Sequence, residues 1–170
     1  MSSALLVVDV QRDLVRYLTP QRREEFLNKL RDLIERARTT GTPVVYIRHN
    51  DEELVLDTDG WEIAAEITPR ADERVVEKTY RDAFRETDLQ QVLSNLSVDH
   101  VVVCGMQTEF CVDATLREAE RRGYRVTLAA DCHATFPVDG ATEEQIRAQV
   151  NRVAAGPVAV VPASSLFAEV

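Results

Sequence analysis

Short runs of aliphatic residues alternate along the chain with segments of helical spacing. Most of the runs are apolar at successive positions, which is typical of strands buried on both faces of a sheet. We therefore expect six short strands. They occupy residues 4–8, 43–47, 74–77, 100–104, 125–130 and 158–161.

Helix start and stop signals separate these runs. Thr19 and Pro20 form a helix start, with a capping residue before proline at the first helical position, and Gly41 ends the pattern that follows. Residues 87–90 and 142–145 match the capping-box pattern and predict two further helices. The inward positions expected on these two helices are Val92, Leu93, Leu96, Ile146, Val150 and Val153.

This alternation indicates an α/β fold with a six-stranded, mainly parallel sheet and helices on both faces. Internal repeats, low-complexity runs and linkers are absent from the sequence. We therefore expect residues 1–170 to form a single domain. In such folds, ligands bind beyond the carboxyl ends of the strands.

Three chemically active side chains fall at or just beyond such strand ends. Asp9 follows the first strand, Lys78 the third and Cys111 the fourth. If the first and fourth strands are neighbours, Asp9 and Cys111 face each other across the crevice. This set suits nucleophilic catalysis, with Asp9 accepting the thiol proton and Lys78 stabilising the thiolate. An Asp–Lys ion pair beside a buried cysteine fits the same spacing.

Cys111 lies after Gly105 at the start of a helical pattern. We expect Thr108 to cap this helix, which places Cys111 in its first turn. Unpaired backbone N–H groups and the positive helix end lower a thiol pKa there and can hold an oxyanion. Packing as a small core residue is an alternative role for Cys111, and we expect Cys104 and Cys132 in the core.

The charge and cysteine content narrow the function classes. The formal net charge of -9 at pH 7 argues against nucleic acid and anionic membranes as partners. An odd number of cysteines without framework spacing suits a reducing compartment. The first apolar run is too short for a signal peptide or a membrane span, so we expect a cytoplasmic protein.

Three segments resemble the isochorismatase-like cysteine hydrolase family. They are residues 5–11 (LLVVDVQ), 76–78 (VEK) and 103–112 (VCGMQTEFCV), and Asp131 after the fifth strand also fits. The match runs from about residue 4 to about residue 136, and three ordered segments in strand context are far more specific than any one of them.

The resemblance implies a three-layer Rossmann-like fold and a catalytic triad of Asp9, Lys78 and Cys111. It also implies a cis peptide between Met106 and Gln107, and an oxyanion hole made by the backbone N–H groups of Gln107 and Cys111. The family forms dimers and larger assemblies, so we expect a homo-oligomer. With this chemistry we expect hydrolysis of an amide-type C–N bond of a small molecule through a thioester acyl-enzyme.

Two branches of the family use different chemistry. The nicotinamidase-like branch has an Asp-x-His metal cluster after its second strand, whereas residues 48–51 are Arg-His-Asn-Asp. We therefore predict no metal and no other cofactor, and we expect His49 in the pocket wall or a loop.

Isochorismatase proper hydrolyses an enol ether of a dianion, and this reaction is the alternative function. Residues 51–62 contain six acidic residues and neither Lys nor Arg. This segment would repel a dianion if it borders the pocket, which favours a small neutral or cationic amide as substrate. A solvated acidic loop is the alternative explanation for the same residues.

Four further residues are candidates for substrate binding. Gln11 resembles a family position beside the catalytic aspartate, and Trp61, Tyr80 and Phe84 are candidate pocket walls. Aromatic residues also pack in cores and at subunit contacts. A thiol redox protein is a competing function, although Cys111 lacks a nearby resolving cysteine. A nucleotide-binding module lacks its glycine-rich fingerprint here.

Overall fold

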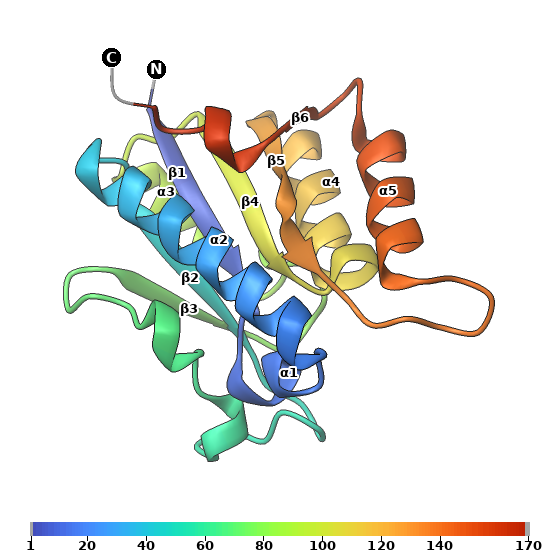
Figure 1. The fold of residues 1–170 in the computed structure, drawn as a ribbon. Coiled ribbons are helices and arrows are strands. Elements are labelled where there is room, and N and C mark those ends of the chain that lie inside the picture. The colour runs from blue at the N-terminus through green and yellow to red at the C-terminus, as the bar shows by residue number, and fades with distance from the viewer. Residues whose placement is uncertain (1, 169–170) are drawn as a thin grey trace.

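The computed structural model describes residues 2–168 and contains a six-stranded sheet of order β3-β2-β1-β4-β5-β6. Every neighbouring pair of strands is parallel (Figure 1). All six predicted strands are present, although the fifth continues past Asp131 instead of ending there. The strands are β1 (Ser3–Val8), β2 (Val44–His49), β3 (Arg74–Lys78), β4 (His100–Met106), β5 (Arg125–Ala134) and β6 (Ala159–Val161).

Helices cover both faces of the sheet, which confirms the predicted layered α/β fold. Leu5 and Val7 of β1 pack in an apolar cluster with α2, whereas Leu6 and Val8 point to the other face and pack with α3 and α4. None of the described helices is both long and apolar enough to cross a membrane. The helices are α1 (Arg12–Arg16), α2 (Pro20–Thr39), α3 (Leu89–Asn95), α4 (Asp113–Arg121) and α5 (Glu143–Ala154).

Two of the predicted helix starts are confirmed. The Thr19 side chain accepts a hydrogen bond from the Arg22 N–H, and Pro20 occupies the first position of α2. Thr142 and Gln145 form a complete capping box at the start of α5. Local side-chain chemistry therefore fixes where both helices begin.

The predicted capping box at residues 87–90 is wrong. Asp88 is the N-cap of α3, and its side chain makes no capping hydrogen bond. Thr87 Oγ1 instead donates to the Ala83 carbonyl and accepts from the Leu89 N–H. The Thr87 hydroxyl therefore bonds to the preceding turn and to the Leu89 N–H, and it takes no part in a capping box.

Two predicted core positions lie at the surface. Leu96 is the C-cap of α3 and is 38% exposed, and Val153 on α5 is 52% exposed. None of the described residues of α5 is fully buried. The apolar stripe of this outer helix is therefore only partly covered by its own chain.

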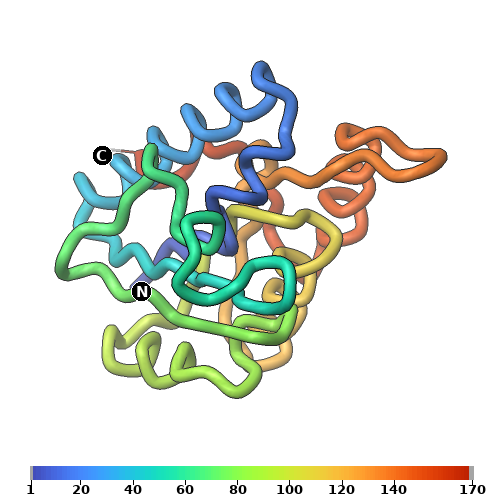
Figure 2. The backbone as a smooth tube through the Cα atoms, turned by 90° about the horizontal axis from the view of Figure 1, so that it is seen from below, coloured from blue at the N-terminus to red at the C-terminus, as the bar shows by residue number. Residues whose placement is uncertain are grey.

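The neighbouring strands β1 and β4 bring distant parts of the chain together at the carboxyl edge of the sheet. Val8 pairs with Gly105. A Cβ at Gly105 would lie 2.0 Å from the Val8 carbonyl oxygen, and its φ of +121° favours glycine. This is the switch point of the sheet, where ligands bind in such folds. Figure 2 looks onto this edge, where the segments that follow β1, β2, β3 and β4 converge.

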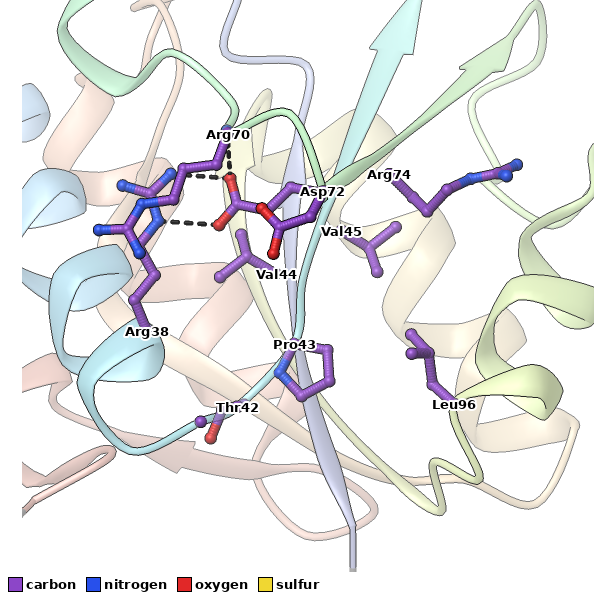
Figure 3. Close-up of a pocket in the computed structure, with 11 residues that line it drawn as sticks. Arg38, Thr42, Pro43, Val44, Val45, Arg70, Asp72, Arg74 and Leu96 are labelled. Carbon is purple, nitrogen blue, oxygen red and sulfur yellow. Dashed lines mark hydrogen bonds and ion pairs between the residues drawn. The ribbon is translucent and has the colours of Figure 1, made fainter.

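A separate cavity of about 320 Å³ lies at the opposite, amino edge of the sheet (Figure 3). Arg38 donates from Nε and Nη2 to the two carboxylate oxygens of Glu73, both at 2.8 Å. Burial disfavours ionisation of Glu73, but the Arg38 hydrogen bonds and the Arg70 N–H outweigh it and lower the Glu73 pKa. This pair joins α2 to the segment before β3, so we assign the cavity a structural role.

We expect Glu73→Gln to lower the free energy of unfolding by about 3 kcal/mol, because it removes the buried one of the two carboxylates that pair with Arg38. The Arg38 and Glu73 side chains are only 11% and 10% exposed. Since the folded pKa of Glu73 is lowered, its stabilisation is present above the unfolded pKa and is lost as the pH falls through the folded pKa. The free energy of unfolding measured in urea should therefore fall more steeply with acidification for wild type than for Glu73→Gln.

Glu35→Gln is the matched control, since Glu35 also pairs with Arg38 but is 51% exposed. It should cost less than about 1 kcal/mol. Equal costs for the two variants would contradict the assignment.

Candidate active site

The structure brings the three predicted catalytic residues together. Asp9 directly follows β1, Lys78 ends β3, and Cys111 lies between β4 and α4. Lys78 Nζ lies 2.8 Å from Asp9 Oδ2 and 3.4 Å from Cys111 Sγ. The Lys78 and Asp9 side chains are 0% and 2% exposed. β2 separates β1 from β3, and the long lysine side chain spans that distance.

Asp9 adopts a constrained conformation at this position. Its φ is +50°, a left-handed value that is uncommon outside glycine. Its backbone N–H donates to the Ile47 carbonyl at 3.0 Å, which ties it to β2. The buried Asp9 Oδ1 has no hydrogen-bond partner within residues 2–168. One carboxylate oxygen therefore pairs with Lys78, and the other has no such partner among these residues.

The expected lowering of the Cys111 thiol pKa is wrong. Burial raises the pKa of Cys111 to about 12, with a further contribution from the Asp9 carboxylate, and Lys78 only partly opposes the two. Near neutral pH the sulfur thus keeps its proton. A base beside it is needed to make it nucleophilic.

The turn that carries Cys111 also differs from the expected helix start. Thr108 does not cap a helix, because its side chain is buried and its hydroxyl pairs with His133 Nδ1 at 2.8 Å. Residues 108–112 form a wide π-type turn in which the Val112 N–H donates to the Gln107 carbonyl, and α4 begins only after it. The peptide between Met106 and Gln107 is cis.

His49 has a more central place than the sequence indicates. It ends β2 and pairs in register with Lys78. Its Nδ1 lies 2.8 Å from Lys78 Nζ, and its Nε2 lies 3.1 Å from Asp51 Oδ2. Asp9 is identified in the sequence as a polar residue at the end of a buried parallel strand. The same sequence feature marks His49, which ends β2 beside β1.

Gln11 is fully buried and supports the site from behind. Its side-chain amide donates to the His49 and Trp61 carbonyls, both at 2.8 Å, and its Oε1 accepts from the His49 N–H at 3.0 Å. The side chain is absent from the cavity wall of the described chain. Gln11 therefore acts as a buttress in this structure and is not placed to bind substrate.

The three predicted aromatic walls also lie elsewhere. Trp61 is buried beneath the Arg48 guanidinium, which lies 3.5 Å from the centre of its ring. Phe84 stacks on Tyr124. Tyr80 contributes its backbone carbonyl, which accepts from Lys78 Nζ at 3.0 Å, while its ring packs under an arginine. The three aromatic side chains therefore do not line the cavity, and other residues form its wall.

A cavity of about 550 Å³ opens over the triad. Its wall combines apolar side chains with carboxylates from the segment after β2. The Arg81 guanidinium packs over the Phe110 ring at 4.5 Å. The residues that line this cavity are Asp9, Asp13, Leu14, Tyr17, His49, Asp51, Glu53, Leu54, Arg81, Gln107, Phe110 and Cys111.

Donor atoms of Asp9, His49 and Cys111 lie within 4.8 Å of one another and form a possible metal site. The Lys78 ammonium, however, contacts all three side chains. A divalent cation would have to displace this buried positive charge, so the donor set does not fit a metal. The absence of a metal stays a prediction.

Comparison with known proteins identifies the family. The Isochorismatase domain matches residues 3–156. Streptothricin hydrolase of Streptomyces noursei is 41% identical over 142 residues, which are 81% of this chain and 56% of that protein. The chain spans about half the length of the two streptothricin hydrolases that it matches.

Two further proteins cover more of their own length. Nicotinamidase 3 of Arabidopsis thaliana is 34% identical over 152 residues, covering 79% of this chain and 74% of that protein. The crystal structure of N-carbamoylsarcosine amidase from Thermoplasma acidophilum has a TM-score of 0.82 at 26% identity, covering 98% of this chain and 99% of that one. The chain therefore belongs to the isochorismatase family.

Proposed function

We propose that this chain is a cysteine hydrolase that cleaves an amide-type C–N bond of a small molecule through a thioester acyl-enzyme. The observation that carries the proposal is the contact of the Lys78 ammonium with both Asp9 and Cys111 beneath a cavity of about 550 Å³. Two of the related proteins are named as amidases, which supports C–N chemistry.

In the proposed acylation, the Cys111 thiol proton moves to Asp9 Oδ1, the buried oxygen without a hydrogen-bond partner in the described chain. Sulfur bonds to the substrate carbonyl carbon, and the carbonyl electron pair moves to oxygen. The backbone N–H groups of Gln107 and Cys111 hold this oxyanion. The C–N bond then breaks, and Asp9 returns the proton to the leaving nitrogen.

Deacylation reverses the use of the same groups. Water attacks the thioester carbonyl carbon, and Asp9 accepts a proton from this water. The C–S bond then breaks. The proton returns to sulfur, so the products are a carboxylic acid, an amine or ammonia, and the regenerated thiol. Lys78 stays in contact with Asp9 Oδ2 at 2.8 Å and stabilises the sulfur anion as it forms.

The raised thiol pKa favours this sequence over a preformed ion pair. A thiol with a pKa of about 12 is almost wholly protonated near neutral pH, so its proton must leave during attack. Asp9 is the acidic side chain that contacts the Lys78 ammonium. The base is therefore held in place by the same cation that stabilises the nucleophile.

The cavity wall favours an amide that carries a positive charge. Asp13, Asp51 and Glu53 contribute carboxylates, whereas Arg81 is the cation in the wall. Within the described chain, Glu53 has no cation at ion-pair distance and its side chain is exposed. An amine-bearing substrate would find this carboxylate unpaired, and a dianionic enol ether would be repelled.

We expect Glu53→Gln to raise KM for an amine-bearing amide by about threefold, the size of one exposed ion pair, with kcat unchanged. KM for the neutral analogue should not move. Glu52→Gln is the matched control, because Glu52 is exposed in the same segment but outside the cavity wall. Steady-state kinetics that show the same response for both variants would argue against a cationic substrate.

The proposal is tested by ammonia or amine release from nicotinamide, carbamoyl, ureido and simple amides, each in neutral and amine-bearing form. We expect at least one amide to be hydrolysed, and prior alkylation of Cys111 to abolish the activity. Hydrolysis that survives complete alkylation of Cys111 would refute the mechanism.

A further inference from the structure

We propose that His49 is a positioning residue that holds the Lys78 ammonium against Asp9 and Cys111. This inference rests on the proposed function, because it assigns a role within the same site. His49 Nδ1 lies 2.8 Å from Lys78 Nζ. The Lys78 side chain is 0% exposed, so water has little access to replace a lost partner.

The contact fixes the proton on the imidazole ring. An ammonium has donors and no acceptor, so His49 Nδ1 must accept from Lys78 with its lone pair. A neutral imidazole then carries its proton on Nε2. Nε2 lies 3.1 Å from Asp51 Oδ2, where the N–H can donate. The chain of contacts thus runs from Asp51 through His49 to Lys78.

Asp51 is itself held as an ionised acceptor. Its Oδ1 accepts from the Glu53 and Leu54 N–H groups, both at 2.8 Å. Burial opposes ionisation, but these N–H groups and His49 outweigh it and lower the Asp51 pKa. The carboxylate therefore stays charged at neutral pH and orients the imidazole ring from its outer side.

The backbone of His49 is also fixed. Gln11 bonds to both the N–H and the carbonyl of His49, at 3.0 and 2.8 Å. This explains why a buried glutamine without access to the cavity lies beside the catalytic strand. Main chain and side chain of His49 are each held by a separate partner.

His49 is one of the acceptors that surround the Lys78 ammonium. Three N–H groups face Asp9 Oδ2 at 2.8 Å, His49 Nδ1 at 2.8 Å and the Tyr80 carbonyl at 3.0 Å, while Cys111 Sγ lies farther away at 3.4 Å. Removing the histidine acceptor leaves the N–H that faced it with the Cys111 sulfur as its nearest acceptor, at the longer distance of 3.4 Å, so Nζ is no longer held on the His49 side and shifts. The ammonium then loses its position relative to the sulfur.

The experiment compares two substitutions at this position that differ in one acceptor. His49→Asn places its side-chain oxygen near the site of Nδ1, where it can accept from Lys78. His49→Gln reaches toward Asp51 and lacks an acceptor at the Nδ1 position. We expect His49→Gln to lower kcat by up to about 10²-fold, the cost of misplacing a catalytic group by about 1 Å, with KM nearly unchanged. His49→Asn should recover most of this loss.

A second readout needs no substrate. Lys78 lowers the Cys111 pKa, so a displaced ammonium should slow alkylation of Cys111 by iodoacetamide, followed by peptide mass spectrometry. We expect slower alkylation in His49→Gln than in His49→Asn. Asp51→Ala, at a side chain that is 45% exposed, should act in the same direction more weakly, and it serves if His49→Gln fails to fold.

The outcomes separate this inference from the proposed function. Equal effects of His49→Gln and His49→Asn on alkylation, or no effect of either, would overturn the positioning role whether or not an amide is hydrolysed. If His49→Gln alone slows alkylation but no amide is hydrolysed, the positioning role stands and the proposed function fails.

Discussion

Replacement of Cys111 by alanine should lower kcat/KM for the identified amide by at least about 10⁴-fold, the scale of losing a nucleophile. The acyl-enzyme cannot form without sulfur, and Asp9 and Lys78 alone provide only binding and polarisation. The side chain is partly exposed at the cavity and removal of one sulfur leaves the Asp9–Lys78 pair intact. The measurement is steady-state hydrolysis, with thermal unfolding as the check on folding.

Cys132→Ala is the matched control. Cys132 is fully buried on β5 and lies outside the cavity wall. This variant should keep its rate and lose about 1 kcal/mol of stability or somewhat more. Comparable activity of Cys111→Ala and Cys132→Ala would show that the thiol at 111 is not the nucleophile.

Asp9→Asn should change turnover and thiol reactivity in opposite directions. Loss of the base should lower kcat by about 10³-fold. The Asp9 carboxylate also raises the Cys111 pKa, so its removal should lower that pKa. Each unit of decrease makes the thiolate fraction about tenfold larger. A thiolate of lower pKa is also a weaker nucleophile, so we expect alkylation of Cys111 at fixed pH near neutrality to become about threefold faster for each unit of decrease.

The same substitution leaves a buried ammonium without its carboxylate. Stability should fall by about 3 kcal/mol, so the assays need a temperature at which the variant stays folded. Asp57→Asn, at an exposed residue of the segment after β2, should change neither rate. Slower alkylation in Asp9→Asn, together with slower turnover, would contradict the assigned roles of Asp9 and Lys78.

The fold and the clustering of Asp9, Lys78 and Cys111 could be predicted because both follow from local patterns. Buried parallel strands are recognisable from their continuous apolar runs, and Asp9, Lys78 and Cys111 stand at strand ends that meet at one edge of the sheet. The side chains therefore converge once the strand order is known. Gly105 adds a further constraint, since only glycine allows the close approach of β4 to Val8.

The thiol pKa could not be predicted in the same way. The expected helix start would lower the thiol pKa, but burial and the Asp9 charge raise it in the folded chain, and Lys78 only partly opposes them. Thr108, which is a typical capping residue, instead pairs with His133 from β5. Both errors arise from contacts between residues far apart in sequence.

The cavity wall was the least predictable part of the site. Side chains of the segment after β2 are placed by long-range bonds, such as the one from Gln11 to the Trp61 carbonyl. The Trp61 side chain is buried and packs against Arg48, whereas Asp51 and Glu53 line the cavity. The predicted homo-oligomer stays a prediction, and the partly covered α5 is one surface that it could use.

The central claim is that Cys111 carries the acyl group, and mass spectrometry of acid-quenched enzyme tests it most directly. Protein mixed with the identified amide, quenched during the first turnovers and digested, should carry the acyl mass on the peptide that contains Cys111. Hydroxylamine should remove this mass, as expected for a thioester. Rapid hydrolysis with the acyl group on another residue would contradict the account.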